Sequence, residues 1–264
     1  MVPEHHPYGV ARAQFGELFR PPGRSDPVPV AVVIHGGFWR ARFGRKLMRS
    51  LCEDLAARGW AAWNLEYRRL GDGGGWPNTF EDVACGIDHL REIAPAGAGH
   101  PVDGEPGALD LTRVVAIGHS AGGHLAVWAA TRPDLPADAP GASPRVRVTA
   151  AVAQAGVVDL RLAWQWRLSE GVVRELLGGP PEERDERYGL ASPADHPPVG
   201  VPVLLVHGSE DDRVPPAMSR RYAEAARERG AECELVMFDG EDHFGHLDPG
   251  NPMWRAVVDW VGRA

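Results

Sequence analysis

Cysteine is scarce in this sequence, which has three among 264 residues: Cys52, Cys85 and Cys233. The number is odd and no two of them have CxxC spacing, so neither a disulfide framework nor a zinc site is expected. We therefore expect three reduced, partly buried thiols in a cytoplasmic protein that uses no metal and no other cofactor.

Long apolar runs and basic patches are also missing. No stretch reaches the ~18 uncharged apolar residues of a membrane span, and segment 1–6 lacks the basic region and apolar core of a secretory signal. The net charge of −8 argues against a large nucleic-acid surface. Lys46 is the single lysine and the arginines are scattered, which indicates coding bias rather than recognition. The expected partner is a small molecule, bound by a monomer or a homodimer.

Short apolar runs alternate with helical patterns along most of the chain. This alternation predicts an α/β fold in which a mostly parallel sheet is covered by helices on both faces. In such sheets the site lies beyond the carboxyl ends of the strands. The expected strands are Val10–Phe19, Val28–Ile34, Trp60–Tyr67, Arg113–Ile117, Val146–Gln154, Val201–His207 and Glu232–Phe238. The expected helices are Phe43–Arg58, Thr79–Ile93, Ala121–Thr131, Pro216–Arg229 and Asn251–Val261.

Two stretches interrupt this alternation. Pro95–Leu111 is rich in glycine, proline and alanine and is expected to be a surface loop. Leu160–Pro198 is too long for a simple crossover and contains a helical pattern, Gly171–Leu177, and a charged run, Glu182–Arg187. We interpret residues 160–198 as a cap inserted over the site, within a single domain that spans residues 1–264.

The strongest chemical signal is Gly118-His119-Ser120-Ala121-Gly122, a G-x-S-x-G pattern between an expected strand and an expected helix. Glycines flank the serine because the turn is tight, and the hydroxyl then projects above the sheet. The N–H of Ala121 points into the same space near a helix N-terminus, where negative charge is favoured. We predict that Ser120 is a nucleophile rather than part of an unreactive glycine-rich turn, and that Ala121 is an oxyanion donor.

An activated serine needs a histidine base and a carboxylate that orients the base. In α/β-hydrolases the acid and then the histidine follow the serine along the chain. The loop after Val201–Val206 supplies Asp211 as the preferred acid, with Glu210 and Asp212 as alternatives. The loop after Glu232–Phe238 supplies His243 as the preferred base, with His246 as the alternative.

The loop after the first buried strand is expected to complete the oxyanion hole. It contains His35-Gly36-Gly37-Phe38-Trp39, and glycines allow the backbone to approach a substrate closely. We predict that the N–H groups of Gly37 and Phe38 act together with that of Ala121. The alternative is a strand-to-helix turn in which glycine serves geometry alone.

Taken together, these motifs resemble the α/β-hydrolase superfamily from about Val28 to Val261. His35-Gly36-Gly37-x-Trp39, the serine motif and Asp242-His243-Phe244 are similar to the esterase branch that includes arylformamidases (kynurenine formamidases). The stretch His207-Gly-x-x-Asp211-x-x-Val214-Pro215 is shared more widely, including with prolyl-oligopeptidase-type hydrolases. That likeness implies that Asp211 is the acid of the triad. His207, at a strand end, is expected to bond its own loop.

The sequence departs from one related pattern and matches another. Hormone-sensitive-lipase-type enzymes have a third glycine where this chain has Phe38, which favours two oxyanion donors over three. Asn64-Leu65-Glu66-Tyr67-Arg68 resembles a strand-end motif of these esterases whose role is structural. We expect Glu66 and Arg68 to form a buried or half-buried ion pair.

Several aromatic residues are expected near the site. Trp39 and Phe244 lie in the predicted site loops, and Trp164 and Trp166 lie in the predicted cap. An aromatic cleft suits an aryl or short acyl group, so these four residues are the candidates for substrate binding. Core packing is the alternative, and it is the expected role of Trp60, Trp63, Trp128 and Trp260.

The sequence thus predicts a serine hydrolase that forms an acyl-enzyme. The candidate substrates are small carboxylic esters and N-formyl or aryl amides. A peptidase or acyl-peptide hydrolase of the prolyl-oligopeptidase type is one alternative. Others are a lyase that uses the same triad and a binding protein that has lost catalysis.

Overall fold

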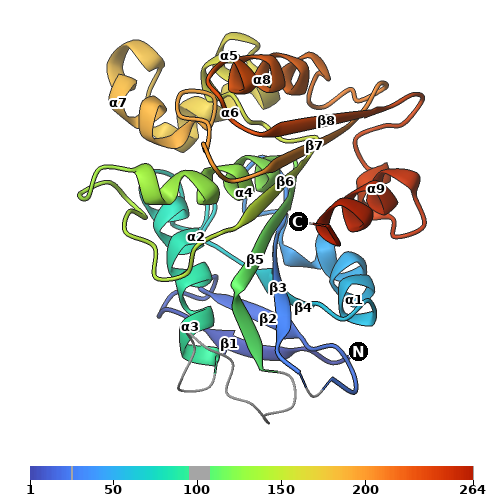
Figure 1. Ribbon diagram of the computed structural model, residues 1–264. Helices are drawn as coiled ribbons and strands as arrows, with labels where there is room; N and C mark the ends of the chain where they lie inside the picture. The colour runs from blue at the N-terminus through green and yellow to red at the C-terminus, as the bar shows by residue number, and fades with distance from the viewer. Residues whose placement is uncertain (25, 95–107, 264) are drawn as a thin grey trace.

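The computed structural model describes residues 1–24, 26–94 and 108–263 (Figure 1). Its eight strands, counted over those residues, form one sheet in the order β1-β2-β4-β3-β5-β6-β7-β8. The strands from β3 to β8 pair in parallel, whereas β1 and β2 are antiparallel to their neighbours. The strands are β1 (Glu4–Pro7), β2 (Phe15–Phe19), β3 (Val28–Ile34), β4 (Ala61–Leu65), β5 (Leu109–His119), β6 (Ala150–Gln154), β7 (Val203–Gly208) and β8 (Cys233–Phe238).

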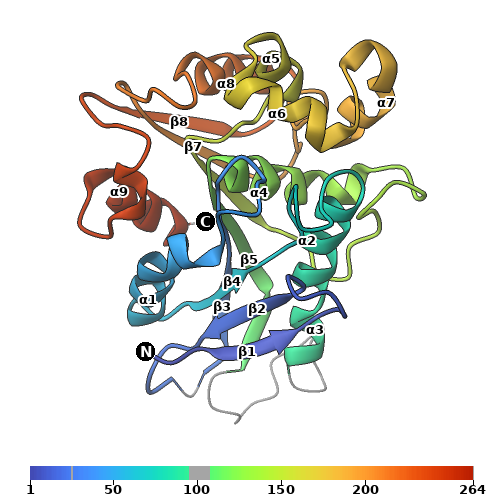
Figure 2. The same ribbon diagram turned by 180° about the vertical axis from the view of Figure 1, so that it is seen from behind.

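Helices cover both faces of the sheet, as Figures 1 and 2 show from opposite sides. One face carries α1 (Arg49–Ala57), preceded by the 3₁₀ turn η1 (Arg45–Met48), and α9 (Pro252–Val261). The other carries α2 (Asn78–Asp88), α3 (Leu90–Ile93), α4 (Ala121–Thr131) and α8 (Ala217–Glu228). The helices α5 (Leu160–Gln165), α6 (Leu168–Leu177) and α7 (Pro181–Ala191) lie between β6 and β7 in the chain. This architecture confirms the predicted α/β-hydrolase fold.

The core has two halves because the central strands are buried on both faces. In β3, Val30, Val32 and Ile34 pack into the half beneath α2 and α4. Ala31 and Val33 point the other way and pack with α1 and α9. Successive side chains of a strand alternate between faces, so a continuous apolar run is what a strand covered by two helical layers requires.

Several predicted boundaries were wrong. Strand β5 begins at Leu109, so residues 109–111 belong to the sheet rather than to the expected loop, while residues 95–107 of that loop lie outside the described part. Strand β6 begins at Ala150 and not at Val146, and β2 begins at Phe15 and not at Val10. Strand β1 was missed because it is a short, polar, mostly exposed edge strand that pairs through its backbone and has no apolar pattern.

The segment between β6 and β7 packs against the main core. Val173, Leu176 and Tyr188 are fully buried there. Its chain is also tied to α4, because Nε2 of His124 donates to the carbonyl oxygen of Ala191 at 2.8 Å. In Figure 1 these helices (yellow to orange) lie beside α8 at one end of the sheet. The charged run that the sequence indicated is part of α7.

None of the helices in the described ranges combines the length and the apolar character that crossing a membrane demands.

The chain changes direction at β3, which determines where the site can form. From β3 it crosses to β4 on one side and later to β5 on the other, so the loops after β3 and β5 leave the sheet side by side. Ligands bind at such a switch point in open α/β sheets. Helix α4 approaches β3 closely here: a Cβ added to Gly122 would lie 2.0 Å from the carbonyl oxygen of Ile34.

The surroundings of two glycines predict opposite effects of glycine-to-alanine changes on stability. We expect Gly122→Ala to lower the free energy of unfolding by about 3 kcal/mol, because its methyl group collides with backbone that cannot yield. In Gly189→Ala, on α7, the added carbon meets nothing within 4 Å, and stability rises by about 0.4–1 kcal/mol. Denaturant unfolding of both variants measures the difference. Equal effects would contradict the close contact.

Candidate active site

Ser120 occupies the turn between β5 and α4 in a conformation that few residues adopt. Its φ and ψ are 56° and −118°, and its N–H donates to the carbonyl oxygen of Gln154 on β6 at 2.8 Å. A Cβ at Gly118 would lie 2.0 Å from the carbonyl oxygen of Gly122, so this tight turn requires the glycines that flank the serine. Such backbone strain is typical of functional sites.

Asp211 and His243 come together across the loops that follow β7 and β8. Nδ1 of His243 donates to Oδ2 of Asp211 at 2.7 Å, and both side chains are almost fully buried. The other carboxylate oxygen accepts from the backbone N–H groups of Arg213 and Val214 at 2.8 and 2.9 Å. Burial would raise the pKa of Asp211, but its histidine and backbone hydrogen bonds outweigh burial and hold the pKa well below its ordinary value. Asp211 is therefore ionised at neutral pH.

A second histidine contacts the same carboxylate. Nε2 of His207 lies 3.1 Å from Oδ2 of Asp211 and 2.9 Å from the carbonyl oxygen of Val214. Both are acceptors, so Nε2 carries the proton, and the hydroxyl of Ser219 lies 2.7 Å from Nδ1. His207 thus bonds its own loop, as the sequence predicts, and it also holds Asp211 in position.

His119 connects the serine turn to the loop of His243. Its Nε2 donates to the carbonyl oxygen of His243 at 2.8 Å, and the two ring centroids are 4.6 Å apart. His246, the alternative base, is fully buried, and its ring nitrogens have no hydrogen-bond partner among the residues described. Of the two candidate bases, His243 is the one that binds Asp211.

The hydroxyl of Ser120 is buried and makes no hydrogen bond within the described chain. The structure brings His243 to the neighbouring His119 but does not close a hydrogen bond to Ser120 itself. Hydrogen bonds of this kind are often long without substrate and shorten when substrate binds. The three residues therefore share one region of the molecule, with the contact between serine and histidine open.

The loop after β3 lies against the serine turn. A Cβ at Gly36 would lie 2.9 Å from Cβ of Ser120, so a larger residue there would collide with the serine. Gly37, Phe38 and Trp39 all have positive φ values, 108°, 51° and 54°. This unusual run turns the backbone sharply just after Gly36, the residue that lies against Ser120.

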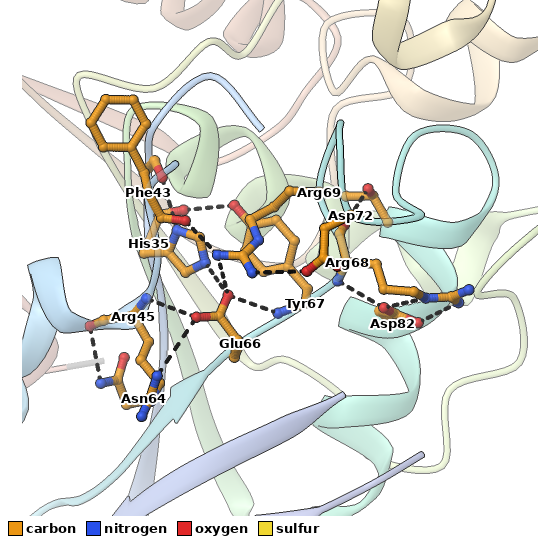
Figure 3. A network of polar contacts seen from close by, with 12 residues as sticks. His35, Phe43, Arg45, Asn64, Glu66, Tyr67, Arg68, Arg69, Asp72 and Asp82 are labelled. Atoms are coloured by element: carbon orange, nitrogen blue, oxygen red, sulfur yellow. Dashed lines mark hydrogen bonds and ion pairs between the residues drawn. The ribbon is translucent and has the colours of Figure 1, made fainter. Parts of the chain in front are cut away.

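A buried polar network supports this loop from the side of β4 (Figure 3). Oε1 of Glu66 accepts from Nε2 of His35 at 2.8 Å and pairs with Nη1 of Arg69 at 3.1 Å. The expected pair between Glu66 and Arg68 was wrong, because Arg68 binds Asp82 on α2 through two nitrogens, at 2.6 and 2.8 Å. Strand β4 ends at Leu65, so the alternation that would place residues 66 and 68 on one side does not continue.

The four aromatic candidates have different surroundings. Trp39 is fully buried, and its ring meets that of His124 edge-on at 5.3 Å. Trp164 and Trp166 are half-buried against the core. Phe244 is 55% exposed and meets the ring of His243 edge-on at 5.3 Å, so it is the candidate that lies beside His243.

Among the residues that the structure describes, no group of three or more His, Cys, Asp or Glu side chains is placed to hold a metal ion. Of the three thiols, Cys52 and Cys233 are buried and Cys85 is exposed; all are free.

Three buried histidines, His119, His124 and His246, are held neutral because burial lowers the pKa of each. Burial and the nearby His243 lower the pKa of His119 to about 3, and burial lowers that of His124 to about 4. The ordinary value is about 6.5. The unfolded chain therefore binds protons at these histidines more readily than the folded chain does. As a result, the free energy of unfolding is highest above about pH 6.5 and falls as the pH drops towards 4.

This difference predicts a pH-dependent stability that one substitution reduces. In His124→Gln, the free energy of unfolding lost between pH 6.5 and 4.5 is expected to shrink by about 2 kcal/mol, since one buried ring no longer resists protonation. Urea unfolding across that range measures the effect. Gln165→Ala, at an exposed position without a titrating group, serves as the control. An unchanged slope in His124→Gln would contradict a buried neutral His124.

Comparison with known proteins shows likeness to esterases. A sequence model of the BD-FAE family matches residues 17–225. Esterase LipQ of Mycobacterium tuberculosis is 32% identical over 219 residues, which cover 80% of this chain and 48% of LipQ. Probable carboxylic ester hydrolase LipM of the same organism is 29% identical, with 82% of this chain and 49% of LipM covered. The chain spans about half the length of these curated relatives.

A solved structure matches over nearly the whole chain. It is a thermophilic esterase from Thermogutta terrifontis, Est2, in its propionate-bound form. The TM-score is 0.75 at 27% sequence identity, and the match covers 99% of this chain and 92% of that one. The fold and the sequence of this chain therefore both resemble those of esterases.

Proposed function

This chain belongs to the BD-FAE family, and we propose that it is a serine hydrolase that cleaves small carboxylic esters through an acyl-enzyme. The observation that carries the proposal is the buried hydrogen bond between His243 and Asp211 beside the strained turn of Ser120. A histidine oriented by a carboxylate next to a serine at such a turn is the arrangement that activates a hydroxyl.

In the proposed reaction, His243 takes the proton of Ser120 as the hydroxyl oxygen attacks the ester carbonyl carbon. Negative charge develops on the carbonyl oxygen, and the N–H groups of Gly37 and Ala121 stabilise it by donating hydrogen bonds. Phe38 is a third candidate donor. His243 then gives its proton to the leaving alcohol as the ester C–O bond breaks. Water attacks the acyl-enzyme by the same route and releases the acid. Asp211 orients and stabilises the imidazolium throughout.

The substrate side of the proposal favours short acyl groups. The structural neighbour carries propionate, and the exposed ring of Phe244 lies beside the base. We propose Trp39, Trp164, Trp166 and Phe244 as the residues that shape the binding site, with residues 160–198 as its cap. LipQ is named as an esterase and LipM as a probable carboxylic ester hydrolase, which supports esters over the N-formyl aryl amides of the arylformamidase branch.

Three variants test the catalytic roles. We expect Ser120→Ala to lower kcat by at least about 10³-fold, and Asp211→Asn by about 10⁴-fold, the size of the effect in serine proteases. Asp212→Asn is the matched control, because its side chain is 72% exposed and pairs with Arg213 at the surface. Hydrolysis of p-nitrophenyl acetate and labelling by a fluorophosphonate measure the outcome. Full activity in Ser120→Ala would overturn the proposal.

A competition between two substrates tests the reaction class. We expect kcat/KM for p-nitrophenyl acetate to exceed that for N-formylkynurenine by a factor of about 100 or more, a difference of about 2.7 kcal/mol in transition-state binding. Both constants are measured on one preparation, with Ser120→Ala as the blank. The reverse order would identify the chain as an arylformamidase.

A further inference from the structure

The imidazole of His35 has an unusual environment, because both ring nitrogens face oxygen acceptors. The residue follows β3 directly and is fully buried. Nδ1 lies 2.8 Å from the carbonyl oxygen of Gly36, and Nε2 lies 2.8 Å from Oε1 of Glu66. A carbonyl oxygen cannot donate, so Nδ1 carries a proton. Nε2 also carries one if the carboxylate is ionised.

The surroundings of Glu66 favour the ionised form. Besides His35, Oε1 faces the N–H of Tyr67 at 3.2 Å and Nη1 of Arg69 at 3.1 Å. Oε2 accepts from the N–H of Arg45 at 3.1 Å. Burial would raise the pKa of Glu66, but the hydrogen bond and charge of His35, and the charge of Arg69, lower it on balance. The positive charge of Arg69 and the two backbone N–H donors therefore stabilise the ionised carboxylate.

The charges around this pair are balanced by other carboxylates. Arg45 binds Glu17 at 2.8 Å, and Arg69 pairs with Asp72 at 3.4 Å. The ring of Tyr67 stacks on that of His35 with centroids 4.4 Å apart. Its hydroxyl donates to the carbonyl oxygen of His35 at 2.9 Å. Figure 3 shows His35, Arg45 and Arg69 around the carboxylate of Glu66.

We propose that His35 is a buried imidazolium that polarises the peptide bond between Gly36 and Gly37 and so strengthens the Gly37 N–H as an oxyanion donor. The carbonyl oxygen that accepts from His35 and this N–H belong to the same peptide group. A hydrogen bond to the oxygen draws electron density from the nitrogen, and linked hydrogen bonds strengthen one another. His35 acts through Gly37 and is a positioning residue. The inference rests on the proposed function.

The same carboxylate also fixes where Gly37 lies. Arg69, held by Glu66, donates to the carbonyl oxygen of Phe43. Phe43 packs so tightly on Gly37 that an added Cβ would lie 2.3 Å from its own Cβ. Glu66 therefore binds the imidazole of His35 and, through Arg69, also holds Phe43 in its place against Gly37.

The protonation state of the His35 imidazole is measured by NMR of protein labelled with ¹⁵N-histidine at pH 7. We expect both ring nitrogens of His35, assigned through backbone correlations, to be protonated in the wild-type protein. A neutral tautomer at His35 would overturn the proposal. This measurement needs no substrate, so it is independent of the proposed esterase activity.

The rate effect is tested with Glu66→Gln, which keeps the shape of the side chain but removes its charge. We expect His35 to become neutral and kcat to fall about tenfold, less than the loss of a whole oxyanion donor, with KM changed by less than about twofold. Glu92→Gln is the matched control: it removes the carboxylate of the exposed His89–Glu92 pair, and kcat stays unchanged.

Wild-type kcat in a folded Glu66→Gln variant would overturn the rate effect. If this variant does not fold, as backbone amide spectra reveal, His35→Gln takes its place with the same expected loss. A different result would contradict the proposed function itself, namely ester hydrolysis at the wild-type rate in Ser120→Ala.

Discussion

The close contact between α4 and the end of β3 is the constraint on which the site depends. Gly122 allows the helix backbone to lie against the carbonyl oxygen of Ile34, and Gly36 allows the next loop to lie against Ser120. Because the chain leaves β3 for one side of the sheet and returns on the other, these two loops are neighbours at the switch point. A side chain at either glycine would separate the serine from the loop that is proposed to stabilise the oxyanion.

The second requirement is that buried charge be compensated. Glu66 and Asp211 lie on opposite sides of the serine turn in the chain order, and each carboxylate is surrounded by donors. An ionised carboxylate without such partners would be strongly destabilising in the interior. Each one fixes a histidine instead: Glu66 binds His35 beneath the loop after β3, and Asp211 binds His243 at the other end of the site.

Several of the buried polar side chains near the site are histidines, and each has a different role because its hydrogen-bond partners differ. His243 donates to Asp211, His207 supports the same carboxylate, and His119 ties the loop of His243 to the serine turn. The low pKa of His119 keeps it neutral, so it does not add a positive charge beside His243. Identical side chains thus serve different purposes, because each ring nitrogen has a different partner.

The sequence alone determined the fold class, the position of Ser120 at a strand-to-helix turn and the loops that hold Asp211 and His243. These features are local: apolar runs, glycine spacing and chain order carry them. The sequence did not determine that Glu66 binds His35 and Arg69 while Arg68 binds Asp82, since the directions of those side chains depend on where β4 ends. Nor did it show that His207 and His243 share one carboxylate oxygen. Only the tertiary structure decided these contacts, because hydrogen-bond partners distant in sequence are chosen by the packing of the elements that carry them.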